Sequence, residues 1–167
     1  MPQPKLDTPG YPSRGDKLFG QGRIDPYESR KKLPDPTRCP QCRALYLKGR
    51  WTWEIPGEPV YEGLCPACRR INDRVAAGII NIRGDFYEAH RDEVIHLVEN
   101  LERLEKERRP MERLMGITNT ESNLRVETTG VHLAQRIGRA LESAYQGDLE
   151  LDFLKGQYKV RVNWQRS

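Results

Sequence analysis

All four cysteines of the chain lie in two Cys-Pro-x-Cys motifs, at positions 39–42 and 65–68. Two tight loops of this kind supply four thiolates, the tetrahedral set of soft ligands that Zn²⁺ prefers, and leave no coordination position open for a substrate. Pro40 and Pro66 stiffen the loops, so backbone N–H groups can point at the sulfur atoms. A redox dithiol is the alternative, although it would need only one motif. We therefore expect one structural Zn²⁺ with the ligands Cys39, Cys42, Cys65 and Cys68.

Basic residues surround the two motifs, and the segment between them carries Trp51 and Trp53. Arg and Lys side chains contact backbone phosphates, and unpaired bases stack on exposed indole rings. Two other interpretations stay open: both tryptophans pack over the metal hairpin, and the arginines are merely solvated. The candidates for RNA binding in this region are Arg43, Lys48, Arg50, Trp51, Arg69 and Arg70.

Residues 1–38 are rich in proline and glycine and poor in apolar side chains, which is typical of a segment without a core of its own. Within this basic tail, Asp25 is placed to cap a single turn. Such a tail can thread between RNA helices and become ordered on contact, and a plain flexible leader is the alternative. Its candidate RNA-binding residues are Arg14, Lys17, Arg23, Arg30, Lys31 and Lys32.

The formal net charge of +4 is unevenly distributed, because basic residues predominate in 1–83 and acidic residues in 84–167. This polarity favours a nucleic-acid partner over a membrane. No apolar run approaches the roughly 18 residues of a spanning helix, and the N-terminus lacks the apolar core of a secretory signal. We expect a cytoplasmic monomer without membrane contact, in a compartment where cysteines stay reduced and bind metal.

The pattern between and after the motifs predicts a treble-clef-like zinc module over residues 39–83. Its parts are the first cysteine loop, a hairpin turning near Gly49, the second loop, and a helix that ends at Gly78 in the position after the C-cap. A short strand follows. Because the module has its own core, we expect Cys39→Ser or Cys68→Ser to unfold residues 39–78 and leave the rest largely folded.

Residues 84–110 read as one long helix, which opens with a capping box of Asp85 and Glu88 and stops by Pro110. Its charged last turns are expected to stand in water. From 111 to 167 the pattern predicts a compact β-β-α-β-β domain, with strands near 111–120 and 123–129, a helix over 130–146 and a final hairpin turning at 155–157. The fold class is therefore α+β.

Other charged residues and the histidines give weaker signals. Lys159 and Arg161 face Glu150 and Asp152 across the last hairpin, which indicates a neutralised solvent face. Arg136 is a minor candidate for RNA contact, as is Arg139. The sequence has no Gly-x-Ser-x-Gly, Walker or His-Glu-x-x-His motif, and the spacing of its three histidines indicates structural roles. We expect that the chain is not an enzyme.

The order of LPDPTRCPQC, KGRWTW, LCPACRRI, AHRDEVIHLV and VHLAQRIGRALESAYQGDLEL, from about Tyr27 to Trp164, resembles a small bacterial zinc-knuckle family. More distantly, the cysteine motifs followed by HLAQRIGRALESAYQGDLELDF and YKVRVNW are similar to the large-ribosomal-subunit export adaptors of archaea and eukaryotes. In those adaptors a zinc module grips the large subunit. The present chain has fewer cysteine motifs, so the resemblance implies only ribosome binding, through the basic residues of the zinc module.

Together these features predict a zinc-stabilised, ribosome-associated factor that binds ribosomal RNA, with the large subunit favoured. Its role would lie in ribosome storage (hibernation), stress or assembly. The alternative is a zinc-dependent protein adaptor or transcription-linked regulator, for which the charged segment ENLERLEKERR at 99–109 would recruit a protein partner.

Overall fold

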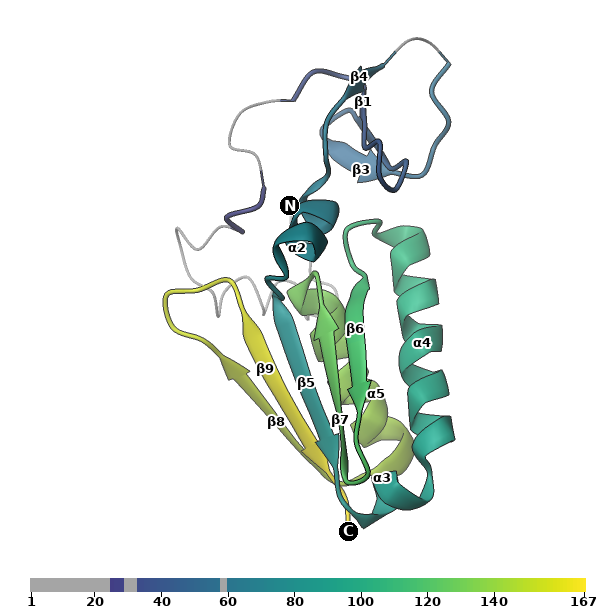
Figure 1. Ribbon diagram of the computed structural model, residues 1–167, viewed down its shortest axis with the longest axis vertical. Helices are drawn as coiled ribbons and strands as arrows, with labels where there is room; N and C mark the ends of the chain where they lie inside the picture. The colour runs from purple at the N-terminus through teal and green to yellow at the C-terminus, as the bar shows by residue number, and fades with distance from the viewer. Residues whose placement is uncertain (1–24, 29–32, 58–59) are drawn as a thin grey trace, which may run out of the picture.

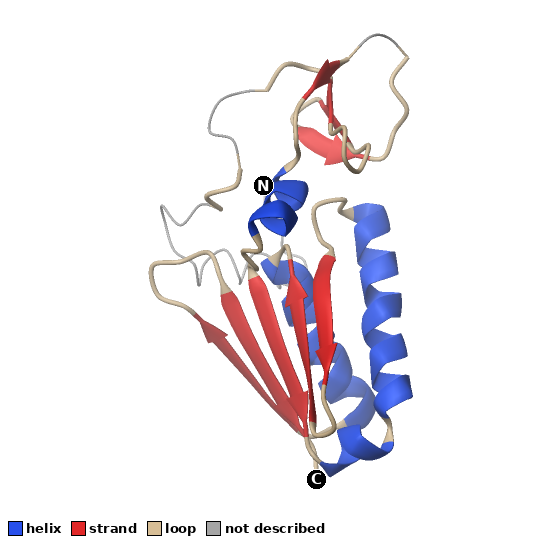
Figure 2. Ribbon diagram, in the orientation of Figure 1, coloured by secondary structure: helices blue, strands red, loops and turns tan. Residues whose placement is uncertain are grey.

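The computed structural model describes residues 25–28, 33–57 and 60–167 of the chain. This part contains four helices and two mixed sheets, which confirms a fold built from both helices and strands. A four-stranded sheet lies beyond one end of a five-stranded sheet, and the C-terminus lies at the opposite end of the molecule (Figure 1). Figure 2 shows that the long helices accompany only the larger sheet.

The small sheet has the order β3-β2-β1-β4, from β1 (Thr37–Arg38), β2 (Leu45–Leu47), β3 (Arg50–Thr52) and β4 (Tyr61–Glu62). The β2–β3 hairpin turns at Lys48 and Gly49, whose φ angles of 53° and 87° lie in the left-handed region that glycine tolerates without strain. The hairpin predicted near Gly49 is thus confirmed. We call β1 to β4 together with helix α2 (Pro66–Asp73) the small module.

Helix α2 ends earlier than predicted. Its C-cap is Arg74, which adopts the left-handed conformation (φ 59°, ψ 44°) and donates its backbone N–H to Arg70 and Ile71. Gly78, the predicted end, instead begins strand β5 (Gly78–Arg83). A Cβ atom at Gly78 would lie 2.4 Å from the Cβ of Ala134, so glycine is required there by close packing rather than by a helix end.

Strand β5 is the centre of the large sheet, whose order is β6-β7-β5-β9-β8. It pairs antiparallel with β7 (Asn123–Thr128) and parallel with β9 (Val160–Gln165), while β6 (Leu114–Asn119) and β8 (Asp148–Phe153) form the edges. This strand was predicted within the zinc module (39–83), but it pairs in the five-stranded sheet. The physical reason is that Ile80 and Ile82, both fully buried, need the long helices as cover.

Two helices cover one face of the large sheet. Helix α5 (Val131–Tyr145) packs on β5, β7, β8 and β9, and α4 (Arg91–Arg108) packs against α5 (Figure 1). Leu133, Ile137 and Leu141 on the inner side of α5 are fully buried. Strands β5 to β9 and helices α3 (Asp85–Ala89), α4 and α5 form what we call the large-sheet unit.

The helix predicted over 84–110 is divided into α3 and α4 at His90. The His90 ring stacks on Phe86 with centroids 4.2 Å apart, and its Nδ1 lies 2.8 Å from Glu93 Oε1. The predicted capping box is wrong, because the N-cap of α3 is Gly84 and makes no side-chain hydrogen bond. No helix in the described ranges is both long enough and apolar enough to cross a bilayer.

The second face of the large sheet carries polar side chains in cross-strand pairs. Asn81 Nδ2 donates to Asn163 Oδ1 at 3.2 Å, and Asp152 stands directly opposite Arg161 in the β8–β9 register. Glu150 faces Asn163 rather than Lys159. The predicted opposition of Arg161 and Asp152 is thus present in the strand register, whereas Glu150 faces an asparagine.

Candidate metal centre and adjoining groove

The sulfur atoms of Cys39, Cys42, Cys65 and Cys68 lie within 4.8 Å of one another. None of the four is in a disulfide, and all except the half-buried Cys42 are buried. The Sγ atoms of Cys42 and Cys65 are 3.7 Å apart, close to the edge of about 3.8 Å expected for a tetrahedron with Zn–S bonds of about 2.3 Å. In size and in chemistry, this donor set could hold one metal ion.

Local backbone geometry brings the sulfurs together. The first cysteine loop is closed by hydrogen bonds from the Cys39 N–H to the Ala44 carbonyl and from the Arg43 N–H to the Cys39 carbonyl. The Ala44 N–H points at Cys42 Sγ (3.5 Å), and the Cys68 N–H points at Cys65 Sγ (3.3 Å) where Cys65 caps helix α2. The predicted N–H···S contacts are therefore confirmed for these two sulfurs.

A fifth residue, Arg113, completes the site from the large-sheet unit. Its Nη2 lies 3.0 Å from Cys42 Sγ and 3.6 Å from Cys65 Sγ, and its Nη1 lies 3.4 Å from Cys68 Sγ. Its Nε donates to the Pro110 carbonyl at 2.7 Å, and only 6% of the residue is exposed. Sequence reasoning missed Arg113. The available signal was the position of Arg113 inside the predicted strand near 111–120, because an arginine needs an anionic partner if its strand buries it.

These contacts stabilise thiolate at one sulfur. The pKa of Cys42 is lowered to about 4, chiefly by the hydrogen bond from the Cys65 thiol, with help from the Ala44 amide and Arg113. The pKa of Cys65 is raised by that same hydrogen bond to Cys42 and by burial, and burial also raises the pKa of Cys68. A metal ion binds thiolates, so metal uptake would release the protons that these groups still carry.

The two tryptophans have different surroundings. Trp51 packs against the cysteine cluster and lies 5.4 Å from the Tyr46 ring centroid, so the packing interpretation describes part of its surface. Trp53 is 37% exposed, and its Nε1 donates at 2.7 Å to the carbonyl of Lys106 in the last turn of α4. The Arg113 guanidinium lies 5.6 Å from the centre of the Trp53 ring. Trp53 therefore connects the hairpin to the large-sheet unit.

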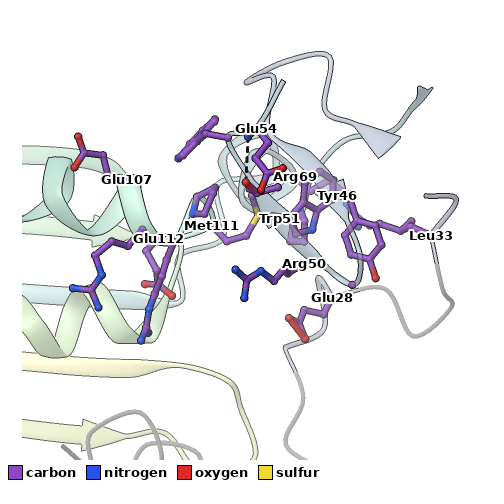
Figure 3. Close-up of a pocket in the computed structure, with 17 residues that line it drawn as sticks. Glu28, Leu33, Tyr46, Arg50, Trp51, Glu54, Arg69, Glu107, Met111 and Glu112 are labelled. Atoms are coloured by element: carbon purple, nitrogen blue, oxygen red, sulfur yellow. Dashed lines mark hydrogen bonds between the residues drawn. The ribbon is translucent and has the colours of Figure 1, made fainter. Parts of the chain in front are cut away.

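An open groove of about 880 Å³ lies between the β2–β3 hairpin and the end of α4 with the loop that follows it (Figure 3). Figure 3 shows Arg50 extending from the hairpin into this space, with Met111 and Glu112 on the side of the large-sheet unit. The aromatic and basic residues that line the groove are Tyr46, Trp51, Trp53, Arg50, Arg69, Arg108 and Arg109.

The basic residues of the groove differ in how far they are engaged. Arg109 pairs with Glu105 (3.4 Å), and Arg69 Nη2 donates to the Tyr27 carbonyl at 3.2 Å. Arg50 and Arg108 are exposed and form no ion pair within residues 25–28, 33–57 and 60–167. These two guanidinium groups are therefore the ones in the groove that can receive an anionic group directly.

The structure changes the predicted RNA-binding set. Arg70 is only 2% exposed; its Nη2 lies 2.6 Å from Asp25 Oδ1 and its Nη1 donates to the Val75 carbonyl. It is a buried structural ion pair and is not available to a phosphate, which corrects its predicted role. Arg43 and Lys48 are exposed but do not line the groove, whereas three predicted residues do line it: Arg50, Trp51 and Arg69.

The predicted candidates in the tail cannot be placed in the same way. Arg14, Lys17, Arg23, Arg30, Lys31 and Lys32 lie outside the described residues. The turn predicted at Asp25 is described and confirmed, since Asp25 Oδ1 accepts the Tyr27 N–H at 2.9 Å. Tyr27 in turn donates its hydroxyl to Asp73 of α2, which attaches this turn to the small module.

A buried ionic cluster underlies the groove. Glu105 is 1% exposed and lies between Arg109 Nε (3.4 Å) and Arg136 Nη1 (3.5 Å). The prediction that the last turns of α4 stand in water therefore fails for Glu105, whereas Glu107 and Arg108 are exposed. Glu112, also buried, accepts the Leu133 N–H at 2.8 Å at the start of α5. Burial raises the pKa of Glu112 to about 7, and the Glu105 carboxylate adds to this. Arg136 thus has a structural partner.

The chain was compared with protein-family models, with curated protein sequences and with solved structures, and none of the three comparisons gives a match. The resemblance to a zinc-knuckle family and to the export adaptors therefore stays a prediction.

Proposed function

We propose that the chain is a zinc-stabilised factor that binds ribosomal RNA in the cytoplasm, with the large subunit favoured, during ribosome storage, stress or assembly. The small module would be a treble-clef-like fold around one Zn²⁺, which suits four thiolates in tetrahedral arrangement. The observation that carries the proposal is the groove, where Arg50 projects beside two tryptophans from a hairpin held by the cysteine loops. Arg50 forms no ion pair with any residue that the structure describes.

The groove offers the two contacts that unpaired RNA uses. Arg50 and Arg108 stand on its two sides, and a planar guanidinium can bind phosphate oxygens in a bidentate manner. The partly exposed ring of Trp53 can stack on an unpaired base, a contact that tolerates any base. Because the cysteine loops hold the hairpin, little conformational entropy is lost when these side chains engage.

The acidic residues of the groove restrict the form of RNA that it can accept. Three exposed glutamates, Glu28, Glu54 and Glu107, lie along it and would repel a long, continuous phosphate backbone. A loop or bulge, which presents few phosphates and some unstacked bases, avoids most of this repulsion. The proposed ligand is therefore an irregular element of folded RNA rather than a duplex.

Co-sedimentation of the zinc-loaded chain with ribosomes and separated subunits, at several salt concentrations, tests this proposal. Arg50→Glu should weaken binding and reduce the salt slope by about 0.7 to 0.9, because one phosphate contact releases close to one counterion. The matched control is Arg161→Glu on the polar sheet face, where Asp152 stands opposite and little change is expected. Equal losses for both variants would place the RNA contact on the sheet instead.

A second candidate function, the zinc-dependent protein adaptor or transcription-linked regulator, is favoured by one observation. Ile55, Tyr61 and Leu64 of the small module are 91%, 62% and 38% exposed, and Tyr61 belongs to the edge strand β4. Exposed apolar side chains next to an open strand edge suit a protein partner. Binding that persists at about 0.5 M salt would support this function over RNA binding, because phosphate contacts weaken steeply there.

A further inference from the structure

Arg113 belongs to the large-sheet unit, but its side chain reaches the candidate metal site of the small module. It follows helix α4 in the large-sheet unit, and its guanidinium contacts three of the four sulfurs of the small module. We infer that metal binding and the docking of the small module on the large-sheet unit are one linked equilibrium, with Arg113 as the positioning residue that links them. This inference does not depend on RNA being the ligand.

Their opposite charges explain why the metal-bound thiolates and the Arg113 guanidinium need each other. Four thiolates around a divalent cation carry a formal charge of −2, and a largely buried charge of this size requires compensation. The N–H groups of Arg113 supply it at 3.0, 3.4 and 3.6 Å from the sulfurs. Conversely, no carboxylate in the described part of the chain pairs with Arg113, so the cysteine sulfurs are its anionic partners there.

The large-sheet unit fixes Arg113 firmly. The Arg113 N–H donates to Thr129 Oγ1 at 2.9 Å, and the Thr129 N–H donates to the Arg113 carbonyl at 2.8 Å. Thr129 Oγ1 also donates to the Met111 carbonyl at 2.6 Å. Because the backbone of this loop is bonded to the segment between β7 and α5, the small module cannot move away without breaking the contacts between Arg113 and sulfur.

Two further contacts cross the same boundary. The side chain of Met111 packs against the cysteine cluster. The Trp53 indole N–H bonds the Lys106 carbonyl, which belongs to the last turn of α4 and has no partner within the helix. The two sides of the groove are therefore held together by the metal site and by Trp53, and loss of metal should separate them. The expectation that cysteine substitution unfolds residues 39–78 and leaves the rest largely folded is thereby extended to the contacts at this boundary.

Zinc affinity, measured by competition with a chromogenic chelator, tests the role of Arg113. Arg113→Gln should raise the Kd for Zn²⁺ about 10- to 100-fold, the range typical for loss of a residue that supports metal ligands. Arg108→Gln is the matched control, since Arg108 lines the same groove but is exposed and contacts no sulfur. An unchanged Kd in Arg113→Gln would overturn the inference.

Trp53→Phe separates docking from the chemistry of the sulfurs, because it removes the bond to Lys106 without touching the cysteines. Linkage is reciprocal, so weaker docking should weaken zinc binding by about 2- to 10-fold, the equivalent of one hydrogen bond. Should Arg113 serve only as a local donor, the Kd of Trp53→Phe would equal that of the wild type, and the linked equilibrium would be wrong.

Hydrogen exchange on the wild-type protein gives a readout that needs no variant to fold. Chelation of the metal should accelerate amide exchange in residues 106–113 by at least about tenfold, as well as in residues 39–73, because opening of the boundary exposes both sides. Faster exchange confined to 39–73 would contradict the inference even if Arg113→Gln failed to fold.

Discussion

The buried carboxylate of Glu112 should make the stability of the protein depend on pH, and Glu112→Gln should remove that dependence. Glu112 is 7% exposed, and its Oε1 accepts the Leu133 N–H at 2.8 Å. A glutamine can accept the same hydrogen bond through its amide oxygen while carrying no charge. The substitution therefore changes the charge of this group with little change of shape.

The magnitude follows from the pKa of the group. The difference between the ordinary value of 4.5 and the folded value of about 7 corresponds to about 3 kcal/mol. Because the folded value is raised, the folded state keeps its proton while the unfolded state loses it between pH 4.5 and about 7. Stability from this group is therefore complete below pH 4.5 and is lost as the pH rises to about 7.

Urea unfolding of both proteins at pH 5, 6, 7 and 8, at one zinc concentration, measures this effect. Across that range the advantage of Glu112→Gln over the wild type should grow by about 2 kcal/mol, and protonation of the cysteines, common to both proteins, cancels in the difference. Glu107→Gln, an exposed control in the same segment, should leave the curve parallel to the wild type. Parallel curves for Glu112→Gln would refute the reasoning about its burial.

Two other substitutions probe the packing that supports the groove. Glu105→Gln should lower the free energy of unfolding, measured in urea titrations, by roughly 1 to 3 kcal/mol. The loss stays moderate because its partner side chains, Arg109 and Arg136, are 35% and 37% exposed and can be rehydrated. Gly138→Ala should also destabilise the protein by roughly 1 to 3 kcal/mol, because the added Cβ would lie 2.7 Å from Val162 Cγ1. This clash outweighs the better helix propensity of alanine. A rise in the thermal midpoint of unfolding would instead show that helix α5 can move off the sheet.

Elements with a strong local pattern could be predicted from the sequence. The helix expected over 130–146 is observed at Val131–Tyr145, and the last hairpin turns where expected, because apolar spacing and turn residues act over a few positions. Strand β5 could not be assigned in the same way. Its neighbours β7 and β9 come from 40 to 80 residues later in the chain, and pairing over such distances leaves no local signal.

The residues of the candidate site also differ in whether a local sequence signal identifies them. The four cysteines could be predicted because each loop is a local motif, whereas Arg113 contacts Cys68 across 45 positions. Arg70 shows the opposite error: it looked like an exposed cation, but Asp25 approaches it from a part of the chain 45 residues earlier and buries it. Clustered charge in the sequence therefore does not show which guanidinium groups face the solvent.

The measurement that tests the proposed function most directly is the distribution of the protein across a sucrose gradient of cell lysate, taken in several growth phases. The account predicts that the zinc-loaded chain travels with ribosomal fractions, the large subunit above all, and that Arg50→Glu moves it toward the top of the gradient. Absence of the wild-type chain from every ribosomal fraction in every growth phase would contradict it.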